Sequence, residues 1–121
     1  LALVLGREPW SLFVPGDLDG PHLARLLEHG EVGPVNAVVL APHGSRHGTS
    51  RTLLERLDPK LALVSCGWRN RFGHPHRESV SLLAEHGVPL WRTDHDGTIR
   101  LSAANDGWRV EVSPRTSPGT R

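Results

Sequence analysis

Residues 41–50, A-P-H-G-S-R-H-G-T-S, bring two histidines, three hydroxyl side chains and an arginine together within ten positions. An imidazole at His43 can bind a metal or hold a phosphate. Gly44 lets a ligand approach the backbone, and Ser45 can donate a hydrogen bond to a phosphate oxygen. The alternative is a loop histidine that binds nothing. This loop is the first candidate site.

A carboxylate, Asp17, stands in the turn P-G-D-L-D-G after a second apolar run. At the end of a strand it can bind a metal or act as a base. The ordinary alternative is that it caps the helix that follows. Asp19 competes for that capping role, which leaves Asp17 available for chemistry.

A third group of polar side chains is the basic stretch G-W-R-N-R-F-G-H-P-H, residues 67–76. His74 and His76 stand at the start of a predicted helix, where backbone N–H groups attract anions. Arg69 and Arg71 precede them and can grip a phosphate through two hydrogen bonds each. We interpret this stretch as phosphate-binding. The alternative is a capping histidine beside solvated arginines.

The surrounding pattern predicts the elements that must position these three groups. We predict strands over residues 1–5, 10–14, 35–41, 61–65 and 90–93, helices over 21–30, 51–57 and 74–87, a tight turn over 94–97, and a hairpin of strands 98–102 and 108–112. Three strand–loop–helix units followed by a hairpin are typical of the α/β class with a partly parallel sheet. In such sheets ligands bind at the loops after the carboxyl ends of strands.

The composition fits a globular domain of 121 residues with 37% hydrophobic and 22% charged side chains. No apolar run approaches the ~20 residues of a membrane span, and the lack of methionine suggests a piece of a longer protein. Lys60 is the only lysine among 14 basic residues. Such arginine use suits nucleic acid, or it reflects genomic base composition. Cys66 stands alone, which excludes an internal disulfide and a cysteine-based zinc site.

Four segments in order resemble a known family: V-P-G-D-L-D, V-V-L-A-P-H-G-S-R-H-G-T-S, A-L-V-S-C-G-W-R-N-R-F-G-H-P-H and P-L-W-R-T-D-H-D-G-T-I. They are similar to the C-terminal half of the metallo-β-lactamase-like domain of ComEC competence proteins, which internalise DNA in transformable bacteria. The similarity extends to about Leu101. It implies an α/β fold that is part of an αββα sandwich, with a mixed sheet and flanking helices, over residues 1–112. Residues 113–121 are expected to form a disordered tail.

The resemblance also implies functional roles for individual residues. Asp17 matches the aspartate that bridges two metals, and His43 matches a histidine of one metal's shell. The residues implied to bind substrate phosphate are Ser45, Arg69, Asn70, Arg71, His74 and His76. The complete domain would hold two divalent metals, zinc or manganese. The family's main metal motif, H-x-H-x-D-H, is absent here, and Pro42 replaces a family histidine. Whether this chain alone holds any metal stays open.

The function implied by the resemblance is hydrolysis of phosphodiesters in incoming DNA by a metal-bound hydroxide. We assign no catalytic residue within this chain and expect it to be inactive alone. The implied partners are DNA, the missing N-terminal half, a membrane channel portion and a second copy. The parent would be an integral membrane protein with this soluble domain on the extracytoplasmic side of a bacterial membrane.

Two other functions stay open at this stage. One is a metal-free domain that contacts DNA or stabilises the uptake channel without catalysis. The other is a phosphoesterase acting on a small choline- or lipid-linked phosphate. Half of a sandwich should also expose an apolar sheet face. Candidates for the strands that border it are those of Val38, Leu40, Leu61 and Leu63, whose faces a continuous apolar run does not assign. We expect dimerisation or poor solubility through that face.

Overall fold

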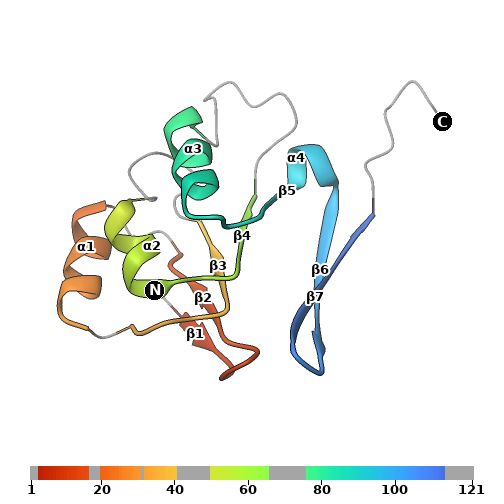
Figure 1. The fold of residues 1–121 in the computed structure, drawn as a ribbon, viewed down its shortest axis with the longest axis horizontal. Coiled ribbons are helices and arrows are strands. Elements are labelled where there is room, and N and C mark those ends of the chain that lie inside the picture. The colour runs from red at the N-terminus through yellow and green to blue at the C-terminus, as the bar shows by residue number, and fades with distance from the viewer. Residues whose placement is uncertain (1–2, 17–19, 31, 41–49, 66–75, 114–121) are drawn as a thin grey trace.

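The computed structural model describes residues 3–16, 20–30, 32–40, 50–65 and 76–113. The elements in chain order are β1 (Leu3–Leu5), β2 (Leu12–Val14), α1 (Gly20–Glu28), β3 (Ala37–Val39), α2 (Arg51–Leu57), β4 (Leu61–Val64), α3 (Arg77–Glu85), β5 (Leu90–Arg92), α4 (Thr93–Asp96), β6 (Thr98–Ala104) and β7 (Gly107–Ser113). Figure 1 shows helices α1, α2 and α3 beside the first sheet and the β6–β7 hairpin on its other side.

The main sheet has five strands in the order β1-β2-β3-β4-β5. β1 and β2 form an antiparallel hairpin, whereas the β2–β3, β3–β4 and β4–β5 pairs are parallel. β6 and β7 form a separate antiparallel pair. The α/β class and the mixed sheet with flanking helices are therefore confirmed, and so is the predicted hairpin near the end of the chain.

Alternate residues of the strands separate the two faces of the sheet. Phe13, Val38 and Ala62 share one row of the register and are fully buried. They belong to one hydrophobic cluster with leucines of the three long helices, which are Leu23, Leu27, Leu53, Leu54, Leu57 and Leu83. The helices therefore cover one face of the sheet, and this layer is the core of the chain.

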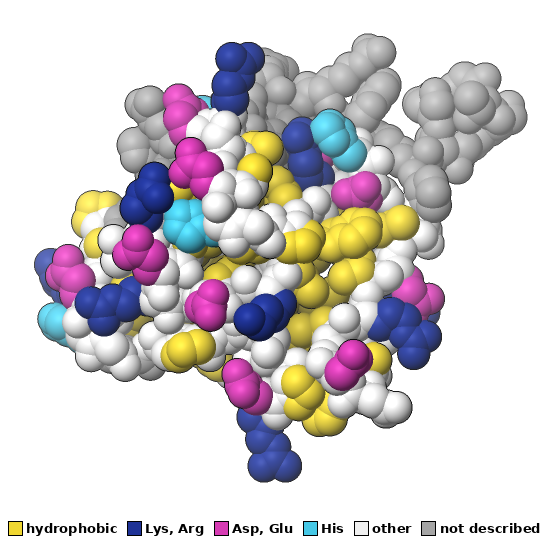
Figure 2. All heavy atoms as spheres, viewed as in Figure 1, with side chains coloured by type: hydrophobic (Ala, Val, Ile, Leu, Met, Phe, Trp, Pro, Cys, Tyr) yellow, Lys and Arg dark blue, Asp and Glu magenta, His cyan; other side chains and the backbone are white. Residues whose placement is uncertain are grey.

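The opposite face of the sheet is less well covered. Val14, Val39, Leu63 and Trp91 lie on it and are half-buried. None of them belongs to the cluster beneath the helices. Figure 2 shows hydrophobic side chains reaching the surface between the helices and the β6–β7 hairpin.

Three of the four residues named as candidates beside an exposed sheet face are buried. Val38 and Leu40 are 0% and 2% exposed because the helices pack on their side of the sheet. Leu61 is 8% exposed although it lies on the other face. Only Leu63 is half-exposed on the uncovered side.

Two indole groups join the β6–β7 hairpin to the start of β2. Trp10 Nε1 donates to the carbonyl oxygen of Ala104 at 2.6 Å. Trp108 Nε1 donates to the carbonyl oxygen of Ser11 at 3.1 Å. These bonds link segments more than ninety positions apart. They fix one end of the hairpin against the sheet.

One helix starts where the sequence predicts, one starts later than predicted, and one predicted turn is helical. α2 begins at the predicted residue 51, and Ser50 caps it, since its Oγ accepts from Leu53 N at 3.1 Å. α3 begins at Arg77, after the predicted start at residue 74. Residues 94–97 were predicted as a tight turn, but Thr93–Asp96 form one helical turn. No helix within the described ranges has the length and apolar character needed to cross a membrane.

Candidate functional site

The carboxyl ends of four neighbouring parallel strands lie along one edge of the sheet. The register pairs Phe13 with Val38, Val39 with Leu63 and Val64 with Arg92. β2, β3, β4 and β5 therefore end side by side (Figure 1). The segments that follow β2, β3 and β4 contain the three groups of polar residues identified in the sequence. This edge is the candidate functional site.

Most of the predicted site residues lie outside the described residues. They are Asp17, His43, Ser45, Arg69, Asn70, Arg71 and His74. Their roles as metal or phosphate ligands stay predictions. His76 is the one predicted site residue within the described part of the chain.

His76 is the N-cap residue of α3. Its backbone is extended, with φ −66° and ψ 150°, and its carbonyl oxygen accepts from Val80 N at 3.1 Å. Its half-buried side chain makes no capping hydrogen bond to the helix backbone. Arg77 opens the helix and is exposed, and Glu78 follows it in the first turn. The start of α3 thus presents an imidazole, a guanidinium and helix N–H groups close to the strand-end edge.

The donors in the described part of the chain do not form a complete metal site. Among the described residues, no group of three or more histidine, cysteine, aspartate or glutamate side chains could hold an ion. The predicted ligands outside them, Asp17 and His43, are two. A catalytic zinc site takes three protein ligands in addition to water. The two predicted ligands are fewer than such a site needs, so no reaction step is derived through a metal here.

The sequence did not single out the side chains at the end of β5, which the structure places at the same edge. Arg92 Nε donates to Asp94 Oδ1 at 3.0 Å, and Arg92 Nη2 donates to Asp94 Oδ2 at 2.8 Å. The backbone N–H of Arg92 donates to Asp96 Oδ2 at 2.8 Å. The run R-T-D-H-D, which begins in the last two residues of the predicted strand 90–93, was the available signal. Two aspartates in a single helical turn thus hold the end of β5.

The Arg92–Asp94 pair is largely shielded from water. The two side chains are 23% and 9% exposed. Burial raises the pKa of Asp94, but the hydrogen bonds and charge of Arg92 outweigh it, so the pKa lies below the ordinary value. The exposed imidazole of His95 adds to this, with its Nε2 3.9 Å from Asp94 Oδ2. Asp94 is therefore an ionised anchor for Arg92.

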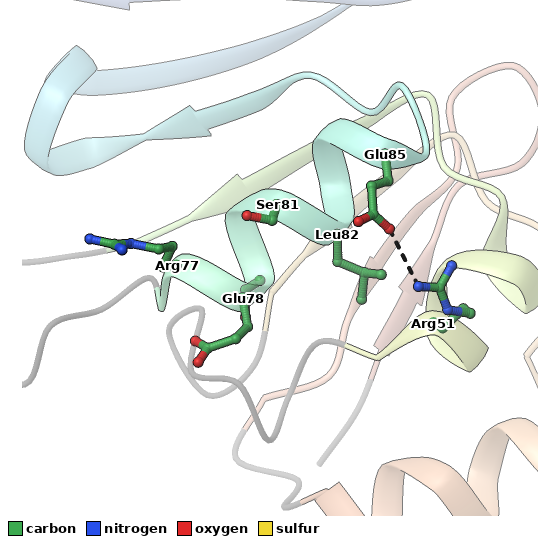
Figure 3. Close-up of a pocket in the computed structure, with 7 residues that line it drawn as sticks. Arg51, Arg77, Glu78, Ser81, Leu82 and Glu85 are labelled. Carbon is green, nitrogen blue, oxygen red and sulfur yellow. Dashed lines mark hydrogen bonds and ion pairs between the residues drawn. The ribbon is translucent and has the colours of Figure 1, made fainter.

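A hollow of about 440 Å³ lies beside α3. It is lined by Arg51, Arg77, Glu78, Ser79, Ser81, Leu82 and Glu85. Arg51 Nη2 lies 3.3 Å from Glu85 Oε2, which ties the start of α2 to the end of α3 (Figure 3). Ser79 is buried, and its Oγ has no hydrogen-bond partner. With two arginines and two glutamates, the lining is balanced in charge and does not favour anions.

Comparison with known proteins finds relatives but no matching family profile. The chain is similar to ComE operon protein 3 of Bacillus subtilis strain 168, with 40% identity over 72 residues, which are 60% of this chain and 9% of that protein. It is similar to competence protein ComA of Neisseria gonorrhoeae, with 29% identity over 84% of this chain and 15% of that protein. Recombination protein 2 of Haemophilus influenzae is 27% identical over 84% of this chain and 12% of that protein.

The chain spans only about a tenth of the length of these relatives, between 9% and 15%. The similarity to the Neisseria and Haemophilus proteins covers most of the chain, so it includes segments that lie outside the described residues as well as the strands. The Neisseria and Haemophilus proteins are therefore similar to most of the chain rather than to one loop.

Proposed function

We propose that this chain is the C-terminal half of a metallo-β-lactamase-like domain in a ComEC-type DNA-uptake protein. The complete domain would hydrolyse phosphodiesters of incoming DNA. The observation that carries the proposal is the similarity to competence proteins, which extends in two relatives over 84% of the chain. Homologues of this kind indicate a competence or DNA-uptake protein.

The topology supports a site at the strand-end edge. Parallel strands end together, so loops that follow β2, β3 and β4 start at neighbouring positions. The same edge receives the start of α3, with His76 and Arg77. We assign phosphate binding to Ser45, Arg69, Asn70, Arg71, His74 and His76. Arginine guanidinium groups and the N–H groups at the start of a helix can donate hydrogen bonds to phosphodiester oxygens.

Asp17 and His43 are our proposed contribution to a metal centre. Two divalent metals, when bound, supply Lewis acidity and lower the pKa of bound water. Since this chain offers two donors, the other ligands must come from a second segment that carries H-x-H-x-D-H. The role left to this chain is to bind and orient the phosphodiester.

The less well covered face of the sheet supports the idea of a missing layer. Val14, Val39, Leu63 and Trp91 form a half-buried apolar row opposite the helices. A second sheet packed at about 10 Å would bury such a row in a sandwich. We propose that the N-terminal half of the domain provides that layer.

The test has two parts. Reading the coding sequence upstream of Leu1 should reveal H-x-H-x-D-H. Purified chain mixed with labelled DNA and Mn²⁺ or Zn²⁺ should show no cleavage above buffer, because its ligand set is incomplete. Absence of the motif upstream would contradict the catalytic proposal, and so would robust metal-dependent cleavage by this chain alone.

A second candidate function is a metal-free domain that contacts DNA or stabilises the uptake channel. The observation that favours it is Pro42, which stands where the family carries a histidine next to His43. Under this alternative the chain binds DNA, and the upstream segment lacks the metal motif. The same reading of the upstream sequence therefore separates the two candidates.

A further inference from the structure

Arg92 lies at the carboxyl end of β5, on the face of the sheet that the helices cover. The register places it beside Val64 of β4, which is buried in the cluster beneath the helices. Leu90, two residues earlier in β5, packs against the same cluster. Alternate residues of a strand share a face, so the side chain of Arg92 lies on the helix side of the sheet at the strand-end edge.

The start of α3 lies on the same side and at the same edge. α3 connects the parallel strands β4 and β5, so it runs back from the edge where β4 ends to the edge where β5 begins (Figure 1). His76 is its N-cap residue, and Arg77 is its first helical residue. The described part of the strand-end edge therefore carries the guanidinium groups of both Arg77 and Arg92.

Asp94 fixes the orientation of the Arg92 guanidinium. Nε and Nη2 of Arg92 donate to the two carboxylate oxygens of Asp94 at 3.0 and 2.8 Å. A bidentate contact of this kind sets the plane of the guanidinium as well as its position. The side chain of Arg92 is 23% exposed and that of Asp94 is 9% exposed, so the arginine is the outer member of the pair. The pair thus presents a positive group, held in one orientation, at the strand-end edge.

We propose that Arg92 is a further phosphate-binding residue of the strand-end edge and that Asp94 is the residue that positions it. The assignment rests on the proposed function, because it adds a contact to the same phosphodiester. A guanidinium has five N–H donors, and arginine binds phosphate through charge-assisted hydrogen bonds. A side chain that a carboxylate already orients loses little rotamer freedom when it binds, which favours affinity.

The charges around Arg92 make the role of Asp94 testable. Arg92 supplies one positive charge, whereas Asp94 and Asp96, which accepts from the Arg92 backbone N–H, supply two negative charges. If Asp94 acts only through its charge, it repels DNA, and Asp94→Asn tightens binding. If Asp94 positions Arg92, Asp94→Asn weakens binding, because the amide replaces one acceptor oxygen by a donor and breaks the bidentate contact.

Fluorescence anisotropy with a labelled single-stranded oligonucleotide separates these outcomes. Arg92→Gln should raise Kd about tenfold and make the slope of log K against log salt concentration shallower by about 1. Arg92→Lys keeps the charge, so it should raise Kd about threefold with the slope unchanged. Asp94→Asn should raise Kd about threefold as well. Asp106→Asn is the matched control, since it removes the same charge from the exposed turn between β6 and β7, and it should not raise Kd. Circular dichroism checks that each variant is folded.

Nuclear magnetic resonance of the wild-type chain tests the contact without any destabilising change. The Nε–H signal of Arg92, identified by its loss in Arg92→Lys, should shift when the oligonucleotide is added. The Nε1–H signal of Trp10, which is hydrogen-bonded at the opposite edge of the sheet, should not shift. An unmoved Arg92 signal, or binding by Asp94→Asn that is as tight as wild type or tighter, would overturn the assignment. If Arg69→Ala/Arg71→Ala still weakens binding in that case, the proposed function stands without Arg92. If the wild-type chain binds no DNA, both fall.

Discussion

Ser11 and Asn36 exchange three hydrogen bonds where β2 and β3 begin. The backbone N–H and the hydroxyl of Ser11 both donate to Asn36 Oδ1, at 3.0 and 2.7 Å. The backbone N–H of Asn36 donates back to Ser11 Oγ at 2.9 Å. Ser11 is 5% exposed. The pair fixes the register of the two strands at the edge of the sheet opposite the candidate site.

Ser11→Ala should lower the free energy of unfolding by about 1–3 kcal/mol. The hydroxyl is both a donor and an acceptor in the pair, and its loss leaves the Asn36 N–H without its partner. Urea unfolding followed by tryptophan fluorescence measures the effect. Ser81→Ala, at an exposed position of α3, is the control and should change stability by less than about 0.5 kcal/mol. Equal effects at the two sites would contradict the role of the pair.

Gly6→Ala should be strongly destabilising. Gly6 has φ +73°, and a Cβ there would collide with the carbonyl oxygen of Trp10. The turn between β1 and β2 must then distort, at a cost of about 1–3 kcal/mol. Gly33→Ala makes the same chemical change where a Cβ meets nothing within 4 Å. Thermal unfolding should show a clear fall in Tm for the first variant and almost none for the second.

Asp94→Asn should remove a pH-dependent part of the stability. The pKa of Asp94 is lowered in the folded chain, so the ionised carboxylate favours folding. This contribution is fully present above the ordinary pKa of about 3.9 and is lost as the pH falls through the folded pKa. We expect Asp94→Asn to cost about 1–3 kcal/mol at pH 7, because Asp94 anchors the Arg92 guanidinium.

Urea unfolding at pH 7 and at pH 3 measures this difference. The gap between wild type and Asp94→Asn should shrink at the lower pH. Asp106→Asn, in the exposed turn between β6 and β7, is the isosteric control. A gap that is the same at both pH values would show that the pair does not depend on ionisation of Asp94.

Local chemistry made much of the fold predictable. The Ser50 cap, the apolar spacing of α1 and the buried strands β3 and β4 follow from patterns within a few residues. The Trp10 and Trp108 bonds join positions more than ninety residues apart, and no local pattern encodes such a pairing. Asn36 interrupts an apolar run in the sequence, and its partner Ser11 lies in a distant segment, just before β2.

The location of the candidate site could be predicted better than the residues that form it. The order of strands and loops predicts one edge for the three polar groups, and β2, β3 and β4 do end at one edge. Arg92 and Asp94 were missed because D-H-D-G is typical of a turn, whereas here it forms a helical turn that folds back on β5. A continuous apolar run does not reveal which face of a strand the helices cover, and only the structure shows that Val38 and Leu40 lie on the helix-covered face.

DNA binding by the strand-end edge is the central claim, and fluorescence anisotropy with a labelled single-stranded oligonucleotide tests it most directly. The variant Arg69→Ala/Arg71→Ala removes two charges from the proposed phosphate-binding stretch. The control Arg25→Ala/Arg56→Ala removes two exposed charges from the last turns of α1 and α2. We predict that the first pair of substitutions raises Kd about tenfold and makes the slope of log K against log salt concentration shallower by about 1–2. The control pair should change Kd by less than about twofold. Equal losses from the two pairs, or no binding by the wild-type chain, would contradict the claim.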